Sequence, residues 1–411
     1  MEEWKEYKLA EVCTKITDGS HSSPKAQESG YPMFSVKDML EYGFDYSKCK
    51  YISQEDYVIL KKNGCVPQKG DVLVAKDGSY LKQIFVCKET KEEAILSSIA
   101  IFRPNSLVDS FFLSYLLKSP QVYNYIANNC VSGSALPRIV LKDFKEVNLP
   151  IPSIEIQKSI VSILKSFDDK IEVNRRINDN LEQQAQALFK SWFVDFEPFK
   201  DGEFVESELG MIPKGWRVCR TNEVFEINIG KTPPRKEPEW FTDNANDNIW
   251  VSIADMGGCG MFVSESSEYL TNEAINRFNI IMVDEGSILL SFKLTVGRVA
   301  IADTKLTTNE AIARFLLPQS YYREFLYLYL KQYKYENLGS TSSIATAVNS
   351  KTIKGMKLII PTNGVISDFS NHTRPLFDKI KVLLQESRRL AELRDALLPK
   401  LMSGEIEVNE I

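Results

Sequence analysis

The sequence predicts an α+β protein with two similar mixed α/β domains and two long helices. A chain of 411 residues is too long for one ordinary hydrophobic core. The stretch "SFDDKIEVNRRINDNLEQQAQALFKSWF" (166–193) matches "PLFDKIKVLLQESRRLAELRDALLPKLM" (375–402) without a gap, at a constant offset of 209 positions (375 against 166). Shorter segments that precede each stretch also match in a shared order. These observations indicate an internal duplication.

The shorter matches define the domain boundaries. "FSVKDM" (34–39) pairs with "VSIADM" (251–256), and "FKEVNLPIP" (144–152) pairs with "IKGMKLIIP" (353–361). Each match alone is weak, but their order is the same in both halves. We expect a first domain at 1–152, a central helix region at 153–200, a second domain at 201–361 and a C-terminal helix region at 362–411.

Within each domain the apolar runs predict the elements. "DVLVA" (71–75) and "SILLS" (287–291) follow glycine turns and predict buried strands. "FFLSYLLKSPQVYNYIANN" (111–129) has helical spacing, and Pro120 divides it into two short helices. "VNLPIP" and "KLIIP" predict a final strand that ends at proline, after which Ser153 is placed to cap a helix.

The repeated stretch has apolar residues at steps of three and four over four heptads, which is the pattern of a two-helix coiled coil, either parallel or antiparallel. About 28 residues predict a rod of roughly 40 Å. The alternative is that each helix docks only on its own domain. Polar positions in the same columns, such as Asn174 and Arg394, would set the register or contact a third protein. The expected helix-pairing residues are Phe167, Ile171, Leu181, Leu188, Trp192, Leu376, Ile380, Leu383, Leu390, Leu397 and Leu401.

Composition excludes several classes of protein. The charged N-terminus has no signal-peptide core, and no apolar run approaches the length of a membrane span, so we expect a cytoplasmic protein without a membrane partner. The seven cysteines have no zinc or redox spacing, and no catalytic or phosphate-loop motif is present, so no metal, cofactor or active site is expected. The net charge of −5 argues only weakly against nucleic acid, because one face of the chain can still be basic.

Three segments carry a family resemblance. The segment from Asn148 to Phe199 closely resembles the central conserved region of the specificity (S) subunits of Type I restriction–modification systems. "ELGMIPKGW" (208–216) is similar to the start of the second target-recognition domain in that family, and "ITDGSHSSPK" (16–25) to the start of the first. The resemblance extends over essentially the whole chain.

The resemblance implies a fold and a task. It implies two target-recognition domains separated by two long antiparallel helices, which form a coiled-coil spacer with pseudo-two-fold symmetry. Each domain would read one part of a bipartite target in double-stranded DNA. Two methyltransferase (M) subunits would dock on the helices, and restriction (R) subunits would join the full complex. The S subunit itself would be non-catalytic. Because the two readers differ in sequence, we expect a non-palindromic target.

The candidate DNA-reading residues lie on matching loops, since side chains on loops reach base edges and phosphates. The loops are 17–25, 76–82 and 132–138 in the first domain, and "GKTPPRK" (230–236), 293–298, 309–314 and 340–343 in the second. For any single basic residue the alternative is an ordinary solvated charge. The candidates are His21, Lys25, Lys76, Ser79, Tyr80, Lys82, Ser134 and Arg138, and then Lys231, Arg235, Lys236, Lys293, Thr295, Arg298, Asn309, Ser342 and Ser343.

Two other functions remain open at this point. One is a scaffold that joins proteins through the helices without reading DNA. The other is a stand-alone enzyme with an unrecognised site. A scaffold would bind DNA only in a salt-sensitive, sequence-blind manner, and an enzyme would modify or cleave DNA without other subunits.

Overall fold

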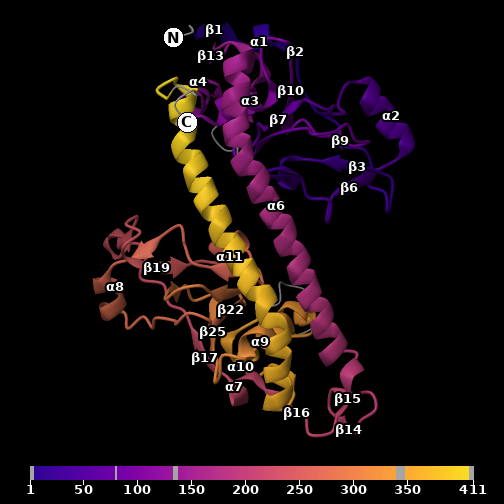
Figure 1. Cartoon of the computed structure of the whole chain (residues 1–411), viewed down its shortest axis with the longest axis vertical. Helices are drawn as coiled ribbons and strands as arrows, with labels where there is room; N and C mark the ends of the chain where they lie inside the picture. The colour runs from indigo at the N-terminus through magenta and orange to yellow at the C-terminus, as the bar shows by residue number, and fades with distance from the viewer. Residues whose placement is uncertain (1–3, 79–80, 133–137, 339–347, 407–411) are drawn as a thin grey trace. The chain divides into compact units, whose positions relative to one another are not determined.

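The computed structural model describes residues 4–78, 81–132, 138–338 and 348–406. The chain divides into two compact units (Figure 1). The first unit consists of residues 1–173 and 387–411, and the second of residues 174–386. Both long helices therefore contribute to both units.

The first unit is built around a four-stranded antiparallel sheet with the order β2-β10-β7-β8. Every side chain of β7 is buried, as its apolar run predicts, because both faces of this strand are covered. The helix pair that follows is divided at Pro120 as expected. The elements of this sheet and the pair are β2 (Cys13–Asp18), β10 (Ile99–Pro104), β7 (Val72–Ala75), β8 (Ile84–Val86), α3 (Ser110–Lys118) and α4 (Pro120–Asn129).

The final strand of the first unit, β13 (Asn148–Ile151), pairs antiparallel with β1 (Lys5–Lys8). A smaller sheet has the order β6-β3-β9 and carries helix α2 (Gln54–Lys62) at its edge. The remaining elements are α1 (Leu9–Val12), β3 (Tyr31–Phe34), β4 (Met39–Leu40), β5 (Gly43–Phe44), β6 (Lys50–Ile52), β9 (Ala94–Ile95), β11 (Val131–Ser132), β12 (Arg138–Ile139) and α5 (Leu141–Lys145).

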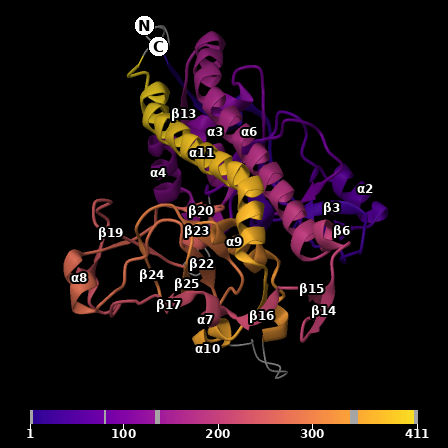
Figure 2. The same cartoon turned by 60° about the horizontal axis from the view of Figure 1, so that its bottom comes forward.

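The second unit repeats the four-stranded core as β17-β25-β22-β23 and adds β20 at its edge (Figure 2). β22 is buried throughout, and α9 fills the position of α3 with its aromatic residues in the core, among them Tyr327 at 1% exposure. These elements are β17 (Glu226–Ile229), β25 (Ile312–Leu316), β22 (Ile288–Ser291), β23 (Val299–Ala302), β20 (Phe262–Val263) and α9 (Tyr322–Gln332).

The final strand of the second unit, β26 (Lys357–Ile360), pairs with β16 (Arg217–Arg220), as β13 pairs with β1. A second sheet has the order β18-β21-β19-β24. The remaining elements are the hairpin β14 (Phe204–Ser207) and β15 (Gly210–Pro213), and α7 (Thr221–Val224), β18 (Phe241–Thr242), β19 (Asn248–Val251), β21 (Tyr269–Leu270), α8 (Asn272–Arg277), β24 (Thr307–Thr308) and α10 (Ser350–Lys354).

The two long helices are α6 (Ile154–Phe193) and α11 (Asn363–Met402), each of 40 residues. Both are longer than the 28-residue stretch that repeats in the sequence, because each starts directly after the final strand of its domain. Helix α6 begins one residue after Ser153, whose carbonyl accepts a hydrogen bond from the Gln157 amide at 3.0 Å. Ser153 thus occupies the capping position that the sequence predicts.

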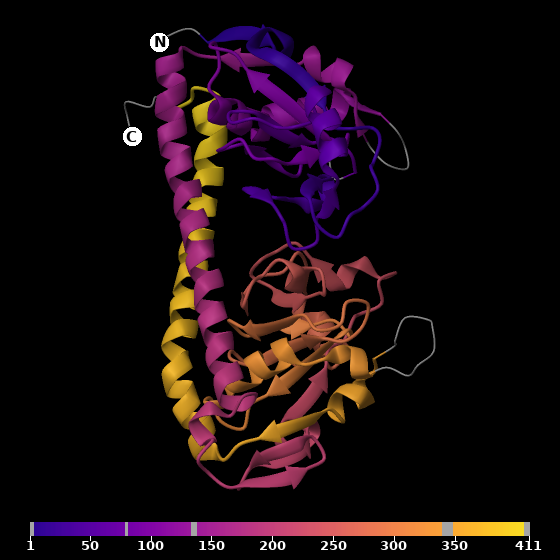
Figure 3. The same cartoon turned by 90° about the vertical axis from the view of Figure 1, so that its right-hand side faces the viewer.

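Within each unit α6 and α11 run in opposite directions (Figure 3). In the first unit, Leu164 of α6 shares a hydrophobic cluster with Leu401 of α11, and Asp168 further along α6 meets Arg394 further back on α11. In the second unit, Asn174 donates to Glu386 at 2.8 Å, and the Trp192 ring lies 5.6 Å from that of Phe369. The pairing is therefore antiparallel within each unit.

The expected helix-pairing side chains are all at least half-buried. Ile380, Leu383 and Leu401 are fully buried. The half-buried ones are Phe167, Ile171, Leu181, Leu188, Trp192, Leu376, Leu390 and Leu397. A second buried face, which includes Phe189 and Phe193, packs against α9 of the second unit. The helices therefore dock on the domains as well as on each other.

Candidate functional site

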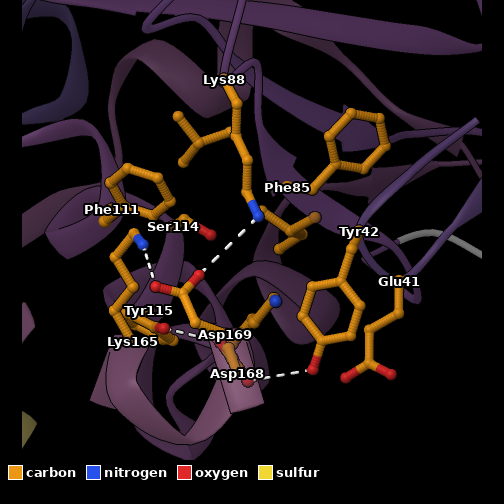
Figure 4. A pocket seen from close by; sticks show the side chains of 13 residues that line it. Glu41, Tyr42, Phe85, Lys88, Phe111, Ser114, Tyr115, Lys165, Asp168 and Asp169 are labelled. Carbon is orange, nitrogen blue, oxygen red and sulfur yellow. Dashed lines mark hydrogen bonds and ion pairs between the residues drawn. The ribbon is translucent and has the colours of Figure 1, made fainter. Parts of the chain in front are cut away.

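In the first unit, α6 and α11 meet the domain at a buried ionic cluster around Asp168. Figure 4 shows its members Asp168, Tyr42 and Tyr115. One carboxylate oxygen accepts hydrogen bonds from Arg394 Nη1 at 2.6 Å and from the Tyr42 hydroxyl at 3.0 Å. The other oxygen accepts from the Tyr115 hydroxyl at 2.6 Å. Burial, reinforced by Asp168, raises the pKa of both tyrosines. Both carboxylate oxygens of Asp168 therefore have hydrogen-bond partners within the protein, and the cluster has a structural role.

The residues of the second unit that match Asp168 and Arg394 are apolar. The repeat offset places Phe377 where Asp168 lies, and Ala185 where Arg394 lies. Both are fully buried, and the Phe377 ring packs 5.5 Å from that of Tyr327. The duplicated helices therefore dock on their two domains by different chemistry.

A neighbouring ion pair exists in both units with its charges exchanged. In the first unit, Lys88 follows strand β8 and forms an ion pair with Glu172 of α6. In the second unit, Asp303 follows the matching strand β23, and its carboxylate lies 2.7 Å from Lys381 Nζ of α11. Lys381 occupies the repeat position of Glu172. We call these two contacts the anchoring pairs.

Two carboxylates bring three candidate loops of the first domain together. Asp18 lies 3.3 Å from His21 Nε2 and 3.0 Å from Lys76 Nζ. Asp77 lies 3.3 Å from Arg138 Nε and also faces Lys76. His21 and Arg138 are exposed, with 76% and 61% of their side chains accessible, whereas Lys76 is buried at 5% exposure. Lys76 therefore holds the loops in place, and the exposed residues face solvent.

The other candidates of this domain lie apart from these contacts. Lys25 and Lys82 are exposed. Lys82 lines a cavity of about 510 Å³ together with Tyr115, Lys118 and Arg394. Five candidates of the two domains lie outside the described residues, namely Ser79, Tyr80, Ser134, Ser342 and Ser343.

In the second domain, the backbone joins the candidate loops. The Lys231 amide donates to Thr308 O at 2.9 Å, and the Asn309 amide donates to Val251 O at 3.0 Å. The Phe292 amide donates to Ala311 O at 2.9 Å. Three loops distant in sequence therefore meet at one end of the β17-β25-β22-β23 sheet.

The basic side chains of the "GKTPPRK" loop differ in how many contacts they make with the rest of the protein. Arg235 donates to both oxygens of Glu268 at 2.7 and 2.8 Å and stacks on Phe241, 4.2 Å from the ring centroid. Lys231 Nζ donates to Phe278 O and Asn279 O, each at 3.1 Å. Lys236 is exposed. Arg235 and Lys231 thus organise the loop, and Lys236 projects from it.

The loop between β22 and β23 carries Lys293 and Thr295, which are both exposed, and Arg298, which is half-buried. Arg298 Nη1 donates to Ile253 O at 2.5 Å, so its guanidinium braces a neighbouring loop.

Residues 309–314 are not one loop. Asn309 is half-buried, and its side-chain oxygen accepts from the Ala311 amide at 3.1 Å. Arg314 lies inside strand β25 at 1% exposure and donates to Ile281 O and Ile229 O. Burial lowers the pKa of Arg314 to about 10. The loop expectation is wrong for this residue, because the strand continues through it.

Sequence reasoning does not point to the acidic partners Asp18, Asp77 and Glu268, because candidates for DNA contact are chosen among basic and polar residues. Asp18 and Asp77 lie beside basic candidates in the sequence, in "ITDGSH" and "AKDG", and this closeness is an available signal. Glu268 has no basic residue nearby in the sequence and gives no such signal.

No helix among the described residues is long and apolar enough to cross a membrane. In the part of the chain that the structure describes, no group of three or more histidine, cysteine, aspartate or glutamate side chains is arranged to hold a metal ion.

Comparison with known proteins identifies the family. The model of the Type I restriction modification DNA specificity domain matches residues 1–183 and again 213–369. The chain is 28% identical to the Type I restriction enzyme HindI specificity subunit of Haemophilus influenzae, over 99% of this chain and 100% of that protein. It is 29% identical to the MjaIX specificity subunit of Methanocaldococcus jannaschii, over 100% of this chain and 95% of that protein.

A solved structure shares the fold. The S subunit of a Type I restriction–modification system from M. genitalium aligns over 97% of this chain and 96% of that one, with a TM-score of 0.52 and 15% identity. Since the family model matches most of the chain, in two copies, the scaffold and stand-alone enzyme alternatives are set aside. The chain belongs to the Type I restriction–modification DNA specificity family, and within such a complex it is the non-catalytic subunit that directs the assembly to its DNA target.

Proposed function

We propose that the chain reads a bipartite, non-palindromic sequence in double-stranded DNA, with one half-site read by domain 1–152 and the other by domain 201–361. The convergence of separate loops at one end of the repeated sheet is the observation that carries this proposal. In the first domain Asp18 and Asp77 join three loops, and in the second the backbone of Lys231, Phe292 and Asn309 joins three more. Since the two loop sets carry different side chains, different half-sites follow.

Exposure and the number of protein partners together divide the candidates into two roles. Exposed basic and polar tips, among them His21 and Arg138 that each face one carboxylate, are suited to base edges and phosphates, because they can donate in the major groove and to the backbone. Lys76, which lies between Asp18 and Asp77, and Arg235, which pairs with Glu268 and stacks on Phe241, fix the loops instead. The proposed DNA-contacting set is His21, Lys25, Lys82, Arg138, Lys236, Lys293 and Thr295.

We propose that α6 and α11 act as a pseudo-symmetric coiled-coil spacer that docks two methyltransferase subunits. Val173 of α6 and Val382 of α11 are related by the repeat offset, and both are exposed, at 48% and 56%. An apolar side chain at the same exposed place on each copy suits two identical partners. Restriction subunits would join the same cytoplasmic complex.

The partner proposal is tested by stoichiometry. Val173→Lys and Val382→Lys are each expected to reduce the number of bound methyltransferase subunits from two to one, measured by native mass spectrometry of the co-expressed complex. Val58→Lys is the matched control, because Val58 is equally exposed, at 56%, but lies on α2. Two bound subunits in both helix variants would overturn the docking site.

The reading proposal is tested by sequencing methylated bases in cells with and without this chain. We expect one bipartite motif with unlike halves to lose methylation when the chain is removed. Exchanging domain 201–361 for that of a relative is expected to change one half of the motif only. A change in both halves, or in neither, would contradict the assignment of one domain to each half-site.

A further inference from the structure

The tip of the β22–β23 loop presents a leucine to solvent. Leu294 is 98% exposed, and the next most exposed large hydrophobic side chain among the described residues is Ile59 at 57%. A nearly fully exposed leucine contributes nothing to a core, and water solvates it poorly. The loop is one that the sequence assigns to DNA reading, through the neighbouring Lys293 and Thr295.

The backbone at Leu294 is also unfavourable for leucine. Its φ is +60°, in the left-handed region where a β-carbon crowds the following carbonyl. The first unit has a left-handed residue at the same place, three positions beyond strand β7, but there the residue is Gly78 with φ +67°. Glycine adopts this conformation without strain. The second unit thus has a bulky apolar side chain where the fold would favour glycine.

The loop that carries this side chain is held firmly at its base. The Ser291 hydroxyl donates to Thr295 O at 2.5 Å and accepts from the Arg298 amide at 3.0 Å. The Gly297 amide donates to Ser291 O at 3.0 Å. Ser291 is itself fully buried. The leucine therefore projects from a braced loop, beside the exposed Lys293.

We propose that Leu294 enters the target duplex and contacts an apolar surface of the bases. Duplex DNA offers two such surfaces, the thymine 5-methyl group in the major groove and the faces of a base step that a wedge has opened. This inference rests on the proposed function, namely that the second domain reads one half-site.

The test uses the complete chain in complex with its methyltransferase partner and a duplex that contains the methylated motif. Leu294→Ala is expected to weaken binding to this duplex on the order of tenfold, with little effect on unrelated DNA. Leu294→Gly is expected to weaken binding equally while the melting temperature stays level or rises, because glycine relieves the backbone strain. Met211→Ala is the control, since Met211 is 54% exposed on β15.

Two modified duplexes distinguish the apolar surfaces. If a thymine methyl is contacted, replacing one thymine of the half-site by uracil will weaken binding of the original protein but not of Leu294→Ala. If a base step is opened, 2-aminopurine in the half-site will brighten on binding of the original protein but not of the variant.

The inference is overturned if Leu294→Ala binds the motif as tightly as the original protein, or if neither modified duplex responds. It is also overturned if the variant loses its methyltransferase partner, which would place the leucine in a protein interface. Failure of the underlying function gives a different result, because the unmodified complex would then not prefer the motif over unrelated DNA.

Discussion

Arg394 of α11 and Asp168 of α6 are joined at 2.6 Å in a site where both side chains are largely buried, with 14% and 11% exposure. The Arg394 guanidinium also lies 3.0 Å from Glu41. Burial favours the neutral form of Arg394, but its hydrogen bonds to Asp395 and Asp168 outweigh this effect and raise its pKa. The pair therefore fixes the register of the two helices at one position in the first unit.

Breaking this pair from one side is expected to destabilise the protein. Arg394→Met leaves the Asp168 carboxylate buried without its cation, at a cost of about 3–5 kcal/mol. Asp168→Asn is expected to cost less, because Arg394 keeps Glu41 and Asp395 as partners. The double variant should lose clearly less than the sum of the two, since neither charge is then left unpaired. Urea unfolding of all four proteins measures this coupling, and additive effects would show that the pair does not set the register.

Tyr115 should give the protein a measurable alkaline limit. Burial raises its pKa above the ordinary value of 10.0, and the Asp168 carboxylate adds to the effect. The folded protein therefore keeps a proton that the unfolded chain releases above pH 10. Stability is fully present below pH 10 and declines as the pH rises beyond it, by up to about 1.4 kcal/mol per pH unit from this group.

Tyr115→Phe tests that assignment. At neutral pH the variant should be less stable by about 1.5–3 kcal/mol, because a hydrogen bond to a carboxylate is lost. Above pH 10 its stability should decline less steeply than that of the original protein. Unfolding by denaturant at pH 8, 10 and 11 makes the comparison, and parallel declines would mean that Tyr115 ionises equally easily in both states.

The anchoring pair of the first unit can be reversed. Glu172→Lys faces Lys88 with a like charge and should destabilise the first unit by about 1–3 kcal/mol. Adding Lys88→Glu restores an opposite-charge pair and should recover most of the loss. Melting curves of the two single variants and the double variant are sufficient, and a double variant as unstable as the worse single one would argue against a direct contact.

Lys236 and Arg235 should respond differently to alanine. Lys236 is exposed, so Lys236→Ala should weaken DNA binding and reduce the dependence of log affinity on log salt by about one unit, without lowering the melting temperature. Arg235→Ala removes the bond to Glu268 and the stacking on Phe241, and should lower the melting temperature as well. Lys305→Ala, another exposed lysine of this unit, controls for loss of charge alone. Equal affinity and salt slope for Lys236→Ala and Lys305→Ala would remove Lys236 from the interface.

Much of the fold is visible in the sequence because it rests on local patterns. The runs at 72–75 and 288–290 are continuous and apolar, which is typical of buried strands, and Pro120 marks the boundary of two helices without any tertiary information. The long helices are predicted from their repeat, and Ser153 is correctly expected to cap a helix, but the 28-residue repeat underestimates the length of both helices because the two copies differ outside it. In both halves the helix starts two positions after a proline that follows the final strand, at 154 and at 363, and this is the better signal.

The candidate site was less accessible to sequence reasoning, because burial depends on distant partners. In the sequence, Lys76 and Arg314 look like ordinary surface charges. In the structure both are buried, and each contacts oxygen atoms of segments that are far away in the sequence. The face of α6 that includes Phe189 was missed for a related reason, since it packs on α9 of the second unit rather than on α11 alone. The periodicity of a helix reveals one buried face. It does not reveal a second face that is buried only by packing against another element.

The opposite polarity of the two anchoring pairs constrains how this gene can be rearranged. A domain transplanted from the second half into the first would bring Asp303 against Glu172, and the reverse exchange would bring Lys88 against Lys381. Recombination between equivalent halves of related genes keeps each attraction, whereas recombination across halves produces two repulsions. New specificities should therefore arise when a domain is replaced by the domain from the same half of a related gene. A library in which domains are exchanged between halves should give folded proteins only when the helix residue of the anchoring pair is also changed to the opposite charge.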